Sequence, residues 1–337
     1  MTKRARIRVN HLAHNISVIR NRCPGSPILG YVKANAYGHG IEQIVPYMSV
    51  DMLAVADIDE ALRVRAVGYS RPVLVQSCYY SNEDWQVLLE HDLTPLLHAK
   101  ELFMVWSKLK PADQRFWIKY DTGMSRLGMY LEDVRSCLDI SQDTVVMTHM
   151  AHEGMDARNL DAIAQVKALQ KDYSVSVCYA PTTLLNTDYK IDASDWIAPG
   201  IALYGIGMSG LKLVMALQAQ VIAVKDIPPH AQVGYGGLYK ADCAERIAIV
   251  AIGYADGLPQ SIGAYDFLTE QGETCTVVGQ VSMDMVTVKC PKQVNPGEWL
   301  TVWSKVADIS YLAASSSRSP YALFSQLGQR VKRELSE

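Results

Sequence analysis

A lysine at the end of a short apolar run is the first residue with catalytic potential. Residues 28–32 are apolar, Lys33 follows them directly, and Gly38 and Gly40 interrupt the segment beyond. This pattern is typical of a buried strand whose carboxyl end opens into a loop. The lysine of such a strand end can extend its amine to solvent. A partly desolvated amine can instead attack a carbonyl group and form a Schiff base.

Two further apolar runs also end in polar, glycine-bearing turns. The segment 119–128 reads KYDTGMSRLG, and its arginine, Arg126, suits the binding of a carboxylate. A surface salt-bridge loop is the alternative interpretation. Tyr254 follows the apolar run 249–252 and precedes an Asp-Gly turn. A tyrosine there usually packs, and its phenol titrates near ~10 in water, so a catalytic role would require activation by its surroundings.

Two other segments carry groups that can bind anions or protons. Segment 199–205 reads PGIALYG, and the backbone N–H groups of Gly200 and Ile201 could cradle a phosphate. His149 ends another apolar run. Taken alone, this histidine is more readily explained as a hydrogen-bonded core residue than as a catalytic one.

The elements that must position these residues alternate along the first two thirds of the chain. Helical spacing separates the strands, for example at 41–48, 59–67 and 160–169. We expect strands at 28–33, 52–56, 72–76, 93–97, 115–120, 144–149, 174–180 and 196–204. Eight strands alternating with helices favour an N-terminal (β/α)8 TIM-like barrel with catalytic groups at the strand carboxyl ends. A doubly wound open sheet is the alternative, but no G-x-G-x-x-G turn supports it.

The pattern changes after Leu211. Short β-rich runs separated by Gly, Pro and Asp follow, at 214–224, 246–253, 274–281, 285–289 and 299–303. We therefore expect two domains, the barrel over 1–211 and a mostly β C-terminal domain over 212–337. The serine-rich tract 313–320 predicts a flexible loop before a final helix or strand pair.

Composition narrows the class of protein. The 337 residues include 32 basic and 35 acidic side chains, for a net charge of −3, so there is no basic surface of the kind that binds nucleic acid. Seven scattered cysteines without C-x-x-C spacing indicate reduced thiols rather than disulfides or a metal site. The chain starts without a signal-peptide pattern, and its apolar stretch 196–211 is broken by Pro199 and short of the ~20 residues of a membrane span. We expect a cytoplasmic protein with no membrane segment.

The segments quoted above, together with S282-M-D284, resemble the motifs of the alanine racemase family, in family order and over residues 4 to 333. The run VKANAYGHG resembles the family's pyridoxal-phosphate (PLP) lysine motif. The resemblance implies pyridoxal 5'-phosphate bound as a Schiff base to Lys33, with Tyr37 on its phosphate. It also makes Arg126 the partner of the substrate carboxylate and of the cofactor's phenolic oxygen. Tyr254 would be the second base, opposite Lys33, with His149 hydrogen-bonded to it.

Further roles follow from the same resemblance. Gly200, Ile201 and Thr182 would contact the phosphate. The backbone amide of Met283 would contact the substrate carboxylate. Lys119 stands where some members of the family carry a carbamylated lysine that positions the arginine.

Three positions depart from the family pattern. Ala198 replaces the arginine expected to face the pyridine nitrogen. Ala180-Pro181-Thr182 stands where A-N-S is usual, and Pro181 has no N–H to donate. Gln329 replaces a tyrosine, and the membrane-linked serine racemases of vancomycin resistance also have a small amide there. Serine is therefore a possible substrate, and Gln329 a substrate-contacting residue.

The resemblance implies racemisation of a small amino acid, alanine or serine, by two bases. It also implies a homodimer whose subunits share active sites. The product would be a D-amino acid for cell-wall synthesis. Two alternatives stay open. One is a PLP decarboxylase of the same fold type, which would want an acidic-cysteine motif that Cys243 and Cys275 do not provide. The other is a weakened PLP-binding homologue with a binding or regulatory role, which Ala198 keeps open.

Overall fold

The computed structural model describes residues 2–77, 79–110, 113–152 and 154–336. The chain forms two compact units. The first, here called the barrel unit, comprises Leu12–Ala36 and Ile44–Leu211. The second, the β unit, comprises Met1–His11, Tyr37–Gln43 and Lys212–Glu337.

An eight-stranded parallel sheet forms the centre of the barrel unit, in the sequential order β2 to β9. Its strands are β2 (Leu29–Tyr31), β3 (Met52–Val55), β4 (Val73–Val75), β5 (Leu93–Leu97), β6 (Trp117–Lys119), β7 (Val145–Met147), β8 (Ser176–Pro181) and β9 (Trp196–Ala198). A parallel bridge between Ile28 and Ile197 brings the first and last strands together. The predicted (β/α)8 barrel is confirmed.

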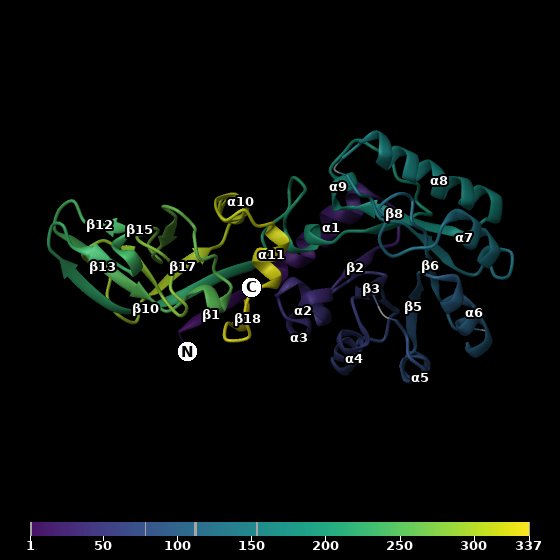
Figure 1. Cartoon of the computed structure of the whole chain (residues 1–337), viewed down its shortest axis with the longest axis horizontal. Helices are drawn as coiled ribbons and strands as arrows, with labels where there is room; N and C mark the ends of the chain where they lie inside the picture. The colour runs from purple at the N-terminus through teal and green to yellow at the C-terminus, as the bar shows by residue number, and fades with distance from the viewer. Residues whose placement is uncertain (1, 78, 111–112, 153, 337) are drawn as a thin grey trace. The chain divides into compact units, whose positions relative to one another are not determined.

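Helices follow the strands and lie around them, as Figure 1 shows for α4 to α8. The helices of this unit are α1 (Val9–Arg22, which begins in the β unit), α4 (Ile58–Ala66), α5 (Asn82–Glu90), α6 (Lys100–Leu109), α7 (Leu131–Leu138), α8 (Ala157–Tyr173) and α9 (Thr182–Leu185). Local sequence starts several of them. The Asp57 carboxylate accepts from the N–H of Glu60 at α4, and Ser81 with Asp84 forms a capping box at α5.

The last predicted strand of the barrel is too long. Residues 196–198 form β9, but Ile201–Tyr204 is the 3-10 helix η2. Between them, Pro199 has no N–H for the sheet, and Gly200 turns the chain with φ −90° and ψ −95°. The backbone N–H groups of Gly200 and Ile201, which were expected to bind a phosphate, therefore lie in the turn after β9.

The β unit contains a second eight-stranded sheet, in the order β13-β16-β15-β14-β17-β10-β1-β18. An extra pairing of β10 with β13 closes most of it into a barrel. Its strands are β1 (Lys3–Arg8), β10 (Met215–Ile227), β13 (Glu245–Val250), β14 (Asp266–Leu268), β15 (Thr274–Val277), β16 (Val286–Lys289), β17 (Trp299–Trp303) and β18 (Lys332–Ser336). The expected mostly β domain is confirmed as a fold.

Strand β1 was not expected from its sequence, because KRARIR is too highly charged to be typical of a strand. Its inward positions, Ala5 and Ile7, are nonetheless fully buried. The strand lies between β10, antiparallel, and β18, parallel. The predicted loop 313–320 is also partly wrong, since α10 (Val306–Ser315) continues into it and α11 (Pro320–Ser325) begins at its end.

Short elements complete the chain. They are α2 (Lys33–Tyr37), α3 (Ile41–Ile44), η1 (Val45–Tyr47), β11 (Gln232–Val233), η3 (Tyr235–Gly237), β12 (Tyr239–Lys240) and η4 (Tyr254–Asp256). Among the described residues, no helix is both long enough and apolar enough to cross a membrane.

Candidate active site

The backbone turns left-handed directly after Lys33. The φ angles of Ala34, Asn35, Ala36 and Tyr37 are 51°, 54°, 55° and 50°. Left-handed helical geometry costs roughly 1–2 kcal/mol per L-residue, so four such residues in succession need support from their surroundings. Glu60 supplies part of it by accepting from the N–H of Asn35 at 2.9 Å. The turn fixes the direction in which the chain leaves Lys33.

The Lys33 side chain stands at the carboxyl end of β2, mostly removed from solvent. Its Nζ lies 5.2 Å from the centroid of the Tyr31 ring. Burial, and secondly the charge of Arg126, lower the pKa of the Lys33 amine. A larger fraction of this amine is therefore neutral and nucleophilic than for a lysine in water.

The loop that carries Arg126 is organised by one carboxylate. Oδ1 of Asp121 accepts from the N–H groups of Gly123, Met124 and Ser125 at 3.0, 2.9 and 3.1 Å. Gly128 is also required here, because its φ is 146° and a Cβ atom would lie 2.7 Å from the Asp121 nitrogen. Arg126 is thus presented from a closed loop rather than from a flexible one.

Lys119 ends β6, and His149 stands two residues beyond the end of the neighbouring strand β7. Lys119 is 8% exposed, and burial lowers the pKa of its amine to about 8. The pKa of His149 is lowered to about 4, by burial first and then by the charges of Lys119, Arg126 and Lys33. His149 is therefore neutral at pH 7, able to donate from one ring nitrogen and accept at the other.

The resulting cluster is cationic, because its basic side chains outnumber its carboxylates and the carboxylates are hydrogen-bonded to backbone N–H groups. Glu60 accepts from the backbone N–H groups of Asn35 and Ala56, and Asp121 accepts from its own loop. Lys33, Lys119 and Arg126 outnumber these two carboxylates. The carboxyl end of this barrel consequently favours an anionic ligand.

Thr182, which begins α9, joins the ends of β8 and β9. Its Oγ1 accepts from the N–H groups of Gly200 and Ala202 at 3.2 and 3.4 Å. Ile201, the other predicted phosphate contact, lies between them and begins η2. Ala198, paired with Pro181, is 8% exposed at the end of β9. The position of the family's arginine thus holds only a methyl group.

In the β unit, Tyr254 and Met283 lie on two interlocked loops. The N–H of Tyr254 donates to the carbonyl of Ser282, and that of Ala255 to the carbonyl of Met283, both at 3.0 Å. A Cβ atom on Gly253 would stand 2.3 Å from the same two carbonyl oxygens, so glycine permits this approach. Tyr254 is 40% exposed and Met283 53%.

Tyr37 and Gln329, predicted to contact phosphate and substrate, also belong to the β unit. The Tyr37 ring centroid lies 5.8 Å from that of Tyr321. Gln329 is exposed beside Gly328 and Arg330. The structure thus gathers Lys33, Lys119, Arg126, His149, Thr182, Gly200 and Ile201 in the barrel unit, and Tyr37, Tyr254, Met283 and Gln329 in the β unit.

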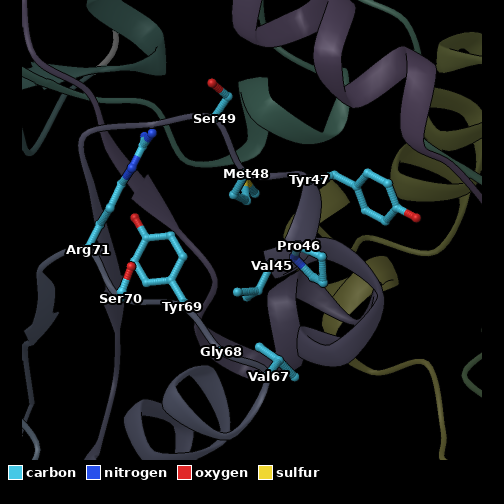
Figure 2. Close-up of a pocket in the computed structure, with 10 residues that line it drawn as sticks. All are labelled: Val45, Pro46, Tyr47, Met48, Ser49, Val67, Gly68, Tyr69, Ser70 and Arg71. Carbon is cyan, nitrogen blue, oxygen red and sulfur yellow. The ribbon is translucent and has the colours of Figure 1, made fainter.

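A small pocket of about 10 Å³ lies among Lys119, Arg126 and His149 themselves. Two larger cavities are also present in the described part of the chain. One of about 410 Å³ is lined by Gly234, Tyr235 and residues 282–285, beside Met283. The other, of about 330 Å³, is lined by residues 45–49 and 67–71, and Figure 2 shows Tyr69, Arg71 and Met48 around it. These segments precede β3 and β4, at the amino ends of the barrel strands, whereas barrel active sites lie at the carboxyl ends. The second cavity is therefore not the candidate active site.

Comparison with known proteins agrees with this geometry. The family model "Alanine racemase, N-terminal domain" matches residues 7–207, and "Alanine racemase, C-terminal domain" matches residues 214–335. The alanine racemase of Legionella pneumophila (strain Lens) is 30% identical over 346 residues, which cover 95% of this chain and 96% of that protein. The Erwinia tasmaniensis enzyme is 32% identical over 342 residues, covering 95% of each.

Solved structures give the same result. The alanine racemase of Acinetobacter baumannii superposes with a TM-score of 0.91 at 27% identity, covering 100% of both chains. The alanine racemase of Bartonella henselae, solved with covalently bound pyridoxal phosphate, shares the fold with a TM-score of 0.87 at 24% identity and full coverage of both chains. The family depends on PLP, and the expected enzyme class, an amino-acid racemase, is confirmed over the decarboxylase alternative. The chain belongs to the alanine racemase family.

Proposed function

We propose that this protein interconverts the L and D forms of alanine, and of serine as a second substrate, with Lys33 and Tyr254 as the two bases. The observation that carries the proposal is the cationic cluster at the carboxyl end of the barrel. Lys33, Lys119 and Arg126 suit a ligand with several negative charges, and PLP together with an amino-acid carboxylate is such a ligand. The lowered pKa of Lys33 suits attack on the cofactor's aldehyde carbon.

The residues would divide the reaction between the two faces of Cα. Bound PLP supplies an electron sink for the carbanion at Cα. The Lys33 amine exchanges the proton on the face that gives the D form, and the Tyr254 phenolic oxygen exchanges the proton on the other face. Arg126 and the Met283 backbone amide hold the substrate carboxylate, which keeps Cα between the bases. Tyr37, Thr182, Gly200 and Ile201 hold the phosphate.

His149 would support Tyr254 in this scheme. Because the pKa of His149 is about 4, the ring is neutral and can accept a hydrogen bond from the phenol. A neutral acceptor favours deprotonation of the phenol less than a carboxylate would. In a site shared between two subunits, the positive charge of the partner's Lys119 and the partner's Arg126 would compensate, because it stabilises a phenolate.

A homodimer would complete each site. Tyr254 and Met283 are accompanied by other exposed apolar side chains of the β unit, with Tyr235 71% and Leu238 73% exposed. Large exposed apolar side chains around functional groups are typical of an interface. We propose that a second copy of this chain covers them, so that Tyr254 and Met283 serve the partner's Lys33.

The test is racemisation in deuterated water. PLP-loaded protein should convert L-alanine and D-alanine at comparable rates and exchange Cα–H, without releasing CO2. Lys33→Ala should lose the borohydride-reducible cofactor adduct and nearly all turnover. Tyr254→Phe should keep Cα–H exchange from D-alanine better than from L-alanine. Equal losses in both directions would contradict the two-base assignment.

Mixed variants test the shared site separately. Lys33→Ala and Tyr254→Phe should each lose racemisation as homodimers, but a hybrid of the two contains one intact site. Activity should therefore return after subunit exchange, which sedimentation and mass-tagged chains can verify. Exchange without recovered activity would refute the shared site and leave the two-base chemistry untouched.

Ala198 supports a second candidate, a PLP-binding homologue with weak catalysis. The family's arginine limits protonation of the pyridine nitrogen, and a methyl group cannot replace it. A protein that forms the Lys33 adduct and does not exchange Cα–H would be of this kind.

A further inference from the structure

Asp256 is a buried carboxylate outside the two-base scheme. Its side chain is 0% exposed in the β unit, two residues after Tyr254. An ionised carboxylate without water needs partners for both oxygens, since an unpaired buried charge costs several kcal/mol. Asp256 has such partners, and they come from elements far apart in the sequence.

One oxygen faces the amino-terminal strand and the Tyr254 loop. Oδ2 accepts from Lys3 Nζ at 2.8 Å and from the N–H of Gly253 at 2.9 Å. Gly253 directly precedes Tyr254, so this bond fixes the backbone that presents the phenol. Lys3 comes from β1, the strand that the sequence analysis did not predict.

The other oxygen faces the carboxyl-terminal segment. Oδ1 accepts from Arg330 Nε at 2.9 Å, and Arg330 Nη1 donates to Asp284 Oδ1 at 2.7 Å. Asp284 directly follows Met283, and Arg330 directly follows Gln329. Two acids and two bases thus form a charge-neutral set, Lys3–Asp256–Arg330–Asp284, which we call the Asp256 network.

Backbone contacts join the same three loops. The N–H of Gly328 donates to the carbonyl of Asp256 at 3.0 Å. A Cβ atom on Gly257 would lie 2.8 Å from the carbonyl oxygen of Gln326, and one on Gly328 would lie 3.0 Å from that of Ala255. The loops therefore pack backbone against backbone.

We propose that Asp256 and Arg330 are positioning residues that hold Tyr254, Met283 and Gln329 as one rigid unit. Each of the three joined loops carries one of these residues: the second base, the carboxylate contact and the residue expected to select the substrate. Arg330 is suited to this role because its planar fork reaches two carboxylates at once, which a lysine cannot do. The inference rests on the proposed two-base function, since it concerns how Tyr254 is aimed.

The test uses Arg330→Lys and Asp256→Asn in the full-length, PLP-loaded protein. Arg330→Lys keeps the positive charge and loses the planar guanidinium that reaches both carboxylates. Because the Arg330 side chain is partly exposed, we expect this variant to fold. Because a displacement of about 1 Å can cost about a hundredfold, we expect Cα–H exchange from L-alanine to fall about tenfold or more. Exchange from D-alanine, which Lys33 serves, should fall far less. In the Arg330→Lys apoprotein, the backbone amides of residues 253–257 and of residues 282–285 should both exchange with deuterium faster than in wild type.

Glu245 provides the matched control. It is a buried carboxylate at the opposite end of β13, paired with Lys289 at 2.8 Å and accepting from the Tyr239 hydroxyl at 2.6 Å. Glu245→Gln should lower thermal stability and leave the ratio of L-side to D-side exchange unchanged.

The outcomes separate the two claims. If wild type exchanges no Cα–H from either enantiomer, the proposed function fails. If wild type racemises alanine but Arg330→Lys lowers both exchange rates equally, or leaves amide exchange at residues 253–257 and 282–285 unchanged, the positioning role is wrong. Should Asp256→Asn fail to fold, Arg330→Lys alone decides the question.

Discussion

The Thr122 and Thr148 hydroxyls share a hydrogen bond of 2.7 Å at the carboxyl end of the barrel. Thr122 lies in the loop that presents Arg126, and Thr148 directly precedes His149. Thr148 is buried, so if this hydrogen bond were broken, water could not easily take the place of the Thr122 hydroxyl. This bond therefore couples the orientation of the loop that carries Arg126 to the segment that carries the neutral His149.

Thr148→Val should weaken that coupling. We expect KM for alanine to rise severalfold because Arg126 loses its fixed position, with about 1 kcal/mol of lost stability. Thr144→Val is the matched control, since Thr144 lies at the amino end of the same strand and donates to the Phe116 carbonyl at 2.9 Å. It should lose similar stability with KM unchanged. Steady-state kinetics and thermal melting measure both, and equal KM values would contradict the coupling.

The barrel could be predicted from sequence because its strands are apolar, buried on both faces and separated by helices of ordinary spacing. Strand β1 could not, because its charged residues are neutralised by partners remote in sequence, such as Glu334 for Arg4. Lys33, Arg126 and Tyr254 could be chosen from the sequence because each lies at or beyond the end of an apolar run, within a motif that resembles the alanine racemase family. Asp256 was not, since the reason for its position lies in Lys3 and Arg330, and only the fold brings these together.

The charge of Lys119 can be tested through pH. The pKa of its amine is lowered from 10.5 to about 8. Below pH 8 the amine is charged in both states, buried in the folded protein and solvated in the unfolded chain, so its charge destabilises the folded state. A difference of this size corresponds to ~3 kcal/mol. Lys119→Met should therefore stabilise the apoprotein in CO2-free buffer at pH 7. The gain should shrink as pH rises from about 8 toward 10.5. Denaturant melts at several pH values measure it, with exposed Lys171→Met as control.

Carbamylation of Lys119 would reverse that result. At pH 8 about half of this amine is neutral, and a neutral amine is the form that adds CO2. With 13C-labelled bicarbonate, wild type should show a carbamate resonance that Lys119→Met lacks. Bicarbonate should then stabilise wild type and leave the variant unaffected. A protein that shows neither resonance nor stabilisation carries an unmodified lysine.

Gln329 should set the ratio of serine to alanine turnover. An exposed amide can donate to and accept from a substrate hydroxyl, whereas a tyrosine would fill that volume. A hydroxyl that is hydrogen-bonded discriminates more strongly than a methyl-sized difference, which gives only ~1–3 kcal/mol. Gln329→Tyr should lower kcat/KM for serine relative to alanine, and Gln329→Leu separates the loss of the amide from the added ring. An unchanged ratio in Gln329→Tyr would remove Gln329 from substrate selection.

Ala198 is one of the three positions that depart from the family pattern. If the shorter side chain of alanine leaves room for water at the end of β9, water or an acid there can protonate the pyridine nitrogen of bound PLP. Protonation favours loss of the cofactor to its amine form by transamination and slows clean racemisation. We therefore expect Ala198→Arg to racemise alanine faster and to accumulate less pyridoxamine phosphate over many turnovers. Ala198→Met fills the space without supplying charge, so a gain in Ala198→Met as well would show that excluding water suffices, and a gain in Ala198→Arg alone would show that the charge is needed. Because Ala198 is 8% exposed, an arginine there also costs stability, so melting temperature must be measured alongside. If folded Ala198→Arg matches wild type in both rate and cofactor loss, the site is dry enough to keep the nitrogen neutral without an arginine.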